Sequence, residues 1–122
     1  MGPLETPEGL RARAAEDLLV AEYLRERDDE LTTPICFHLQ QYVEKNLKAR
    51  LMELSIPYGK VHDLLMLVQM LPDGGDIEAK YSDELIVLSH FATTAKYSAR
   101  TPNADEMEHA FEVAPLIVSM IR

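Results

Sequence analysis

The chain has 122 residues, of which 47% are hydrophobic and 27% charged, the profile of a folded globular domain rather than a disordered segment. This length suits a single hydrophobic core, so residues 1–122 are predicted to form one domain. The formal net charge of −9 argues against a protein that coats nucleic acid with its whole surface, but it allows a local cationic site.

Capping signals and apolar periodicity predict five helical segments, of which the first two are long. Thr6-Pro7 and Thr33-Pro34 each place a capping hydroxyl before a proline at the first helical position. The first helix is therefore expected to start at Thr6-Pro7 and to end before the charged stretch 25–30. The second is expected to run from about Pro34 to Leu54.

Proline and glycine mark the boundaries of the third and fourth segments. The third, around 61–71, ends at Pro72, and a loop of glycine and aspartate follows at 73–76. Ser82 is predicted to cap the fourth helix. Each segment carries its apolar residues at helical spacing, as a helix that packs on a core requires.

The fifth helix begins behind a capping box made of Asn103 and Glu106. No stretch alternates at period two over the length of a strand, and short connections favour antiparallel neighbours. The predicted fold class is therefore all-α, an up-and-down bundle.

Cys36 is the only cysteine, which favours a cytoplasmic location. No apolar run reaches the roughly 20 residues that cross a bilayer, so no membrane partner is expected.

A polar stripe on the second helix is the first candidate site. His38, Gln41, Lys45 and Lys48 fall within roughly 80° of one another on a helix. Two lysines offer point charges for phosphate, and the imidazole and amide offer hydrogen bonds for a base or sugar. The alternative is a solvated face or dimer surface on which Glu44 and Lys48 form a supporting pair four residues apart.

Two further groups are candidates for binding or catalysis. His62 follows the Pro-Gly break as a general base or nucleotide contact, while Asp63 beside it suits a helix N-terminus. Arg100 ends the fourth helix, where it either joins Lys45 or Lys48 around a phosphate or only stabilises the helix end.

Glu106 and His109 form a Glu-x-x-His motif, the spacing used in di-iron helical bundles. Such sites need a second copy and further glutamates, and the chain has one copy, so no metal and no cofactor are expected.

Pieces along nearly the whole chain resemble the HEPN family of small helical domains: Ala15–Ala21, Phe37–Gln41, Glu44–Ala49, Val61–Leu64 and Ala99–Pro102. The resemblance implies a five-helix bundle on a four-helix core that forms homodimers in the prokaryotic cytosol. It also implies a minimal nucleotidyltransferase as partner in a toxin–antitoxin or defence module.

The chain departs from the family at its ribonuclease motif, an arginine and a histidine separated by four to six residues. The corresponding pairs here are separated by more: eleven residues between Arg50 and His62, eight between Arg100 and His109, and ten between Arg27 and His38. The turn Arg100-Thr101-Pro102 resembles a branch with Arg-Tyr-Pro, with Thr101 in place of the tyrosine. The missing spacing argues against ribonuclease activity.

The sequence thus favours a HEPN-like homodimer without an assigned catalytic residue. It would bind a nucleotidyltransferase or a nucleotide or RNA through His38, Gln41, Lys45, Lys48, His62 and Arg100. One alternative is a ribonuclease of non-standard spacing that uses His62 or His109 with Arg100. The other is an oligomeric scaffold without a ligand, whose surplus apolar residues would include Tyr42, Tyr58 and Phe91.

Overall fold

A computed structural model describes residues 5–97 and 101–121, with the side chains of 93–97 left out. In this part of the chain there are five helices and no strands, which confirms the predicted all-α fold class. The helices are α1 (Pro7–Arg27), α2 (Thr32–Glu53), α3 (Leu64–Met70), α4 (Gly75–Tyr97) and α5 (Ala104–Ser119).

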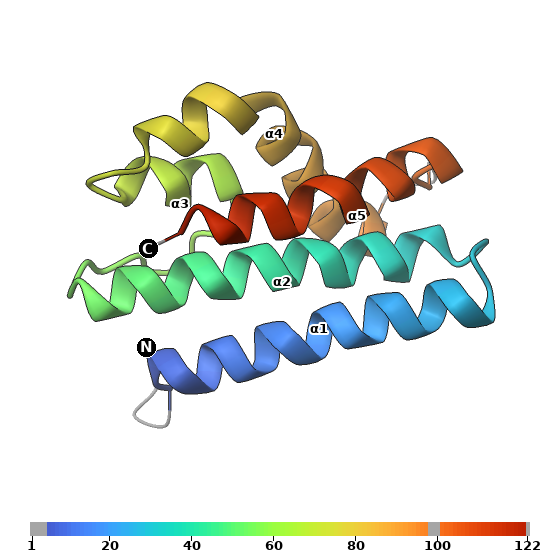
Figure 1. Ribbon diagram of the computed structural model, residues 1–122, viewed down its shortest axis with the longest axis horizontal. Helices are drawn as coiled ribbons and strands as arrows, with labels where there is room; N and C mark the ends of the chain where they lie inside the picture. Colours follow the sequence, from blue (N-terminus) through green and yellow to red (C-terminus); the bar gives the residue numbers. More distant parts are fainter. Residues whose placement is uncertain (1–4, 98–100, 122) are drawn as a thin grey trace.

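Helix α2 is the centre of the bundle and contacts all four other helices. The long helices α1, α2, α4 and α5 alternate in direction along the chain, and the short α3 lies between α2 and α4 (Figure 1). The backbone of α1 packs along α2 alone, so α1 forms one edge of the molecule. None of the described helices is long and apolar enough to cross a membrane.

Three helices begin at the side chains that the sequence marks. The Thr6 hydroxyl accepts a hydrogen bond from the Gly9 N–H at 2.9 Å, and Asn103 and Glu106 form the complete capping box. The Asp63 carboxylate accepts from the N–H of Met66 at 3.1 Å and caps α3. Local capping chemistry therefore sets these starts.

The start of α2 differs from the prediction. The helix begins at Thr32, after Leu31, which provides no side-chain cap, so Thr33 is a first-turn residue instead of the cap. Its buried hydroxyl has no hydrogen-bond partner. Pro34 is compatible with this earlier start. The backbone N–H groups of the first turn have no intrahelical acceptor, so the absence of an N–H group on proline costs no hydrogen bond there.

Helix α4 also begins earlier than expected, at Gly75 instead of Ser82. Tyr81 interrupts it with φ −129° and ψ 20°, so Ser82 opens only the second, longer part. The first part is anchored by Ile77 and by Tyr81 itself, which are 2% and 7% exposed. Burial of these two side chains explains why a short helical turn forms without a sequence cap.

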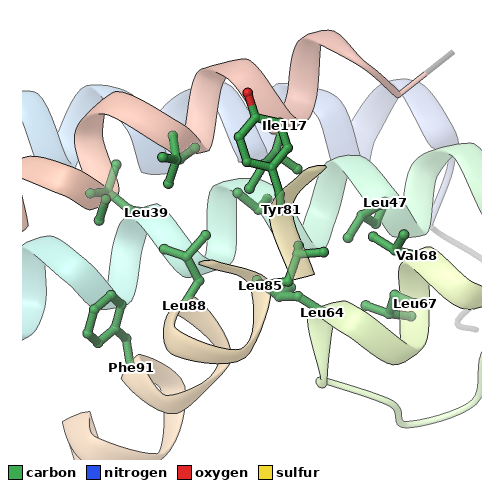
Figure 2. Packing of buried hydrophobic residues seen from close by; sticks show 14 of the residues in the cluster. Leu39, Leu47, Leu64, Leu67, Val68, Tyr81, Leu85, Leu88, Phe91 and Ile117 are labelled. Carbon is green, nitrogen blue, oxygen red and sulfur yellow. The ribbon is translucent and has the colours of Figure 1, made fainter. Parts of the chain in front are cut away.

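One hydrophobic cluster holds the helices together. Leu39 and Leu47 of α2 lie opposite residues of α3, α4 and α5 in this cluster, among them Leu67, Leu85 and Ile117 (Figure 2). Helix α1 contributes the small Ala21, which is fully buried and lets α1 approach α2 closely. The core thus lies mainly on one side of α2, and the buried polar side chains of α2, Gln40, Glu44 and Lys48, lie outside the hydrophobic cluster.

An ion pair ties the start of α1 to the end of α2. The Arg11 guanidinium donates two hydrogen bonds to the Glu53 carboxylate, at 2.7 and 2.8 Å. These bonds, with further attraction from Arg11 and Arg50, lower the pKa of Glu53 to about 2. The two-pronged geometry holds the ends of the helices in register.

Candidate functional site

The cations of the predicted stripe on α2 are paired with carboxylates. Asp17 of α1 accepts a hydrogen bond from the Lys45 ammonium at 2.5 Å, and its other oxygen lies 2.8 Å from Nδ1 of His38. The Asp17 side chain is 10% exposed, while those of His38 and Lys45 are 29% and 24% exposed. This part of the stripe is therefore an interhelical contact of α1 and α2.

A second group of polar side chains centres on Glu44. One carboxylate oxygen accepts from the Gln40 amide at 2.7 Å; the other accepts from the Lys48 ammonium at 3.0 Å and lies 3.1 Å from Nδ1 of His62. Gln41 extends the network by donating from its side-chain amide to the side-chain oxygen Oε1 of Gln40 at 2.7 Å. The Glu44–Lys48 pair of the alternative interpretation is thus present.

That pair is buried and not solvated. Gln40 is fully buried, and Glu44 and Lys48 are 4% and 9% exposed. Burial of charge is expensive unless each charge has partners, and here both oxygens of Glu44 have them. The network therefore holds Lys48 and His62 in defined positions.

A hollow of about 330 Å³ lies beside this network, between the start of α1, α2 and the α2–α3 connection. We call it the lysine hollow. Its lining combines cationic, acidic and aromatic side chains: Lys45, Lys48, Lys60, His62, Glu5, Glu44 and Tyr58, together with Leu10 and Gly59. Three lysines against two glutamates leave its lining at +1 with His62 neutral, in a chain of net charge −9.

The connection between α2 and α3 supplies Tyr58, Gly59 and Lys60, which the sequence did not assign to a binding site. Lys60 is exposed, and its side chain forms no hydrogen bond or ion pair with any described residue. Gly59 has φ +59°, a conformation that favours glycine and turns the chain so that Tyr58 and Lys60 both reach the hollow. The Lys48 ammonium lies 5.3 Å from the centre of the Tyr58 ring.

The structure separates the predicted binding residues into two groups. Lys45, Lys48 and His62 line the lysine hollow, whereas His38 contacts Asp17 and Gln41 contacts Gln40 instead. Arg100 lies outside the described residues. The binding roles of all six residues stay predictions.

His109 lies elsewhere, in a groove between α4 and α5 that shares no lining residue with the lysine hollow. Its Nε2 is 3.6 Å from Glu84 of α4, and its Nδ1 is 3.9 Å from Glu112. No group of three or more metal-ligating side chains is found among the residues that the structure describes. Cys36 is buried, and burial raises the pKa of its thiol to about 12, so the thiol stays protonated.

The chemistry available at the lysine hollow is anion binding next to an oriented imidazole. Contact of Nδ1 with Glu44 leaves Nε2 of His62 directed away from that carboxylate, and the His62 side chain is 66% exposed. A carboxylate that orients an imidazole in this way is a frequent arrangement in catalytic and binding sites.

Comparison with known proteins bears on this arrangement. A model of the HEPN domain family matches residues 7–122, nearly the whole chain. No curated protein and no solved structure matches the chain. The match spans all five helices and every described residue that lines the lysine hollow except Glu5. The chain therefore belongs to the HEPN domain family.

Proposed function

We propose that this HEPN protein binds a phosphate-bearing ligand, a nucleotide, in the lysine hollow. The observation that carries the proposal is the convergence of Lys45, Lys48, Lys60 and His62 on one hollow of an acidic protein. Lysine ammonium groups are strong hydrogen-bond donors to phosphate oxygens. A volume of about 330 Å³ lies at the lower end of the roughly 300–1,000 Å³ typical of small-molecule sites.

The three lysines would have different roles. Lys60 has no carboxylate partner among the described residues, so its charge is available to a phosphate without breaking an existing pair. Lys45 and Lys48 would keep Asp17 and Glu44 as partners and direct their remaining N–H groups to the ligand. The Tyr58 ring offers a face on which a base can stack.

Lys60 is the residue of choice for the test. Reversal of charge at Lys45 or Lys48 would place a glutamate beside Asp17 or Glu44 and endanger the fold. Lys60→Glu is expected to weaken ATP binding about ten-fold, which corresponds to ~1.4 kcal/mol. Isothermal titration calorimetry measures the effect, and AMP and inorganic phosphate show which part of the ligand is bound.

Lys80→Glu is the matched control, because Lys80 is an exposed lysine of α4 outside the lysine hollow. The control makes the same change in net charge and is expected to bind ATP like the wild type. Equal weakening in both variants would show that only the overall charge matters. Absence of ATP, AMP and phosphate binding by the wild type would refute the proposal.

Family membership supports a second part of the proposal, namely that the chain works as a homodimer with a minimal nucleotidyltransferase in a toxin–antitoxin or defence module. The structure adds an exposed apolar surface on α1, where Leu19 and Tyr23 are 64% and 58% exposed. Affinity purification from the native organism with mass spectrometry tests the partner. A stoichiometric nucleotidyltransferase supports the module, and a homo-oligomer without one favours the scaffold alternative.

A ribonuclease that uses His62 is the second candidate, favoured by the 3.1 Å contact of Glu44 with Nδ1 of His62. In this role Nε2 would take the proton of a ribose 2′-hydroxyl as its oxygen attacks the adjacent phosphorus, the P–O bond to the next ribose would break, and water would protonate the departing oxygen. The lysines would stabilise the charge on phosphate. His62→Ala should then abolish RNA cleavage by the purified protein, while His109→Ala should retain it. No cleavage by the wild type, or cleavage that survives His62→Ala, would exclude this candidate.

A further inference from the structure

A second concave surface lies between α4 and α5 and differs in character from the lysine hollow. It has a volume of about 340 Å³ and we call it the α4–α5 groove. Its floor is apolar and consists of core side chains: Leu88, Phe91, Ala110 and Val113 are at most 5% exposed. Leu88 and Phe91 lie next to each other along α4 (Figure 2).

The rim of the groove is acidic. Asp83 and Glu84 come from α4, and Asp105 and Glu106 from α5. Among the described residues, neither Asp83 nor Asp105 forms an ion pair, and both are exposed. The ten described lining residues include His109 but no lysine or arginine. Four carboxylates around an apolar floor create a strongly negative, partly desolvated surface.

One large apolar side chain at the groove is not buried by the fold. Val87 of α4 is 44% exposed and lines the groove beside the acidic rim. Along α4, from Asp83 to Phe91, the groove extends over about 12 Å, the length of roughly two helical turns. A third helix that rests on two packed helices buries apolar residues over such a length.

We propose that the α4–α5 groove is a docking site for a basic amphipathic helix of a partner protein. Apolar residues on one face of this helix cover Val87 and the groove floor, and flanking lysine or arginine side chains pair with Asp83 and Asp105. Charge complementarity selects this occupant, because an acidic or neutral helix would leave Asp83 and Asp105 without compensation. The interaction is independent of the nucleotide proposed for the lysine hollow, since the two sites share no residue.

The experiment uses the full chain and a defined probe, a fluorescein-labelled helical peptide of leucine and lysine about 14 residues long, or roughly four turns. Fluorescence anisotropy measures its binding at physiological salt. Val87→Lys is expected to weaken binding at least about ten-fold, because a lysine there pairs with the rim carboxylates within the protein and repels the probe. A peptide with glutamate in place of lysine is expected not to bind.

Ile86→Lys is the matched control. Ile86 is the neighbour of Val87 on α4 and is equally exposed at 44%, but it does not line the groove. Its lysine variant carries the same net charge and is expected to bind the probe within about two-fold of wild type. Circular dichroism establishes that both variants are folded.

A second pair of variants tests the carboxylates. Asp83→Asn combined with Asp105→Asn should weaken binding of the probe, whereas Asp28→Asn combined with Asp29→Asn, in the connection after α1, should not. Equal losses in the two pairs, equal losses in Val87→Lys and Ile86→Lys, or no binding of the probe would overturn the proposal. ATP binding in the lysine hollow is expected to be unchanged in all of these variants, so a failure of the docking proposal is distinguishable from a failure of the proposed nucleotide site.

Discussion

Replacement of Glu44 by leucine is expected to lower the free energy of unfolding by about 3 kcal/mol. Glu44 is 4% exposed and accepts hydrogen bonds from Gln40 and Lys48. Without the carboxylate, the Lys48 ammonium keeps a buried charge with no counter-ion, and the fully buried Gln40 amide loses its acceptor. Removal of one partner of a buried pair is costly for this reason, whatever the net value of the intact pair.

Urea unfolding followed by circular dichroism at neutral pH measures the change. The control is Glu112→Leu, an identical substitution on α5 at a side chain that is 73% exposed, for which a change within about 0.5 kcal/mol is expected. A second substitution, Lys48→Met in the Glu44→Leu background, removes the stranded charge and should recover about 1–2 kcal/mol. No recovery would mean that the loss arises from Gln40 or from packing instead.

The same network shows what can be read from the sequence and what cannot. The spacing of Lys45 and Lys48 and the Pro-Gly break before His62 indicate polar groups near one end of α2, and these three residues do meet at the lysine hollow. The sequence does not indicate which carboxylates pair with these residues. Asp17 is 28 residues from Lys45 in the chain, and such pairings depend on how α1 packs on α2.

The sequence of α1 nevertheless indicates that Asp17 lies on a buried face. Leu10, Ala14, Asp17 and Ala21 share one helical face, and all four are buried in α1. An aspartate on a buried face requires a cation from the facing helix, because an unpaired buried carboxylate is unstable. Lys60 carried no such signal, since an exposed lysine after a glycine is ordinary on a protein surface.

Helix starts follow the same division between local and distant causes. Thr6 and Asn103 act through neighbours three residues away, so their sequence patterns are sufficient to predict α1 and α5. The early starts of α2 and α4 result from packing. Ile77 and Tyr81 are buried against the core, and no capping motif in the sequence announces the turn that carries them.

Gly74→Ala is expected to lower the free energy of unfolding by about 3 kcal/mol. A Cβ atom on Gly74 would lie 2.0 Å from the backbone oxygen of Val68 and 3.2 Å from its Cγ1. Val68 is fully buried in α3, and the Gly74 N–H donates to the Leu71 carbonyl at 3.1 Å. The clash is with backbone atoms of a packed helix, so relief requires displacement of the whole turn that leads into α4.

Gly75→Ala provides the contrast from the next position along the chain. Nothing lies within 4 Å of a Cβ placed on Gly75, which is the first residue of α4. Alanine there restricts the unfolded chain without a steric cost, so a gain of about 0.5 kcal/mol is expected. Both variants are compared by urea unfolding. Equal effects of the two substitutions would contradict the close approach of Val68 to Gly74. The sequence alone does not distinguish these two adjacent glycines. The structure distinguishes them, because Val68 packs against Gly74 and not against Gly75.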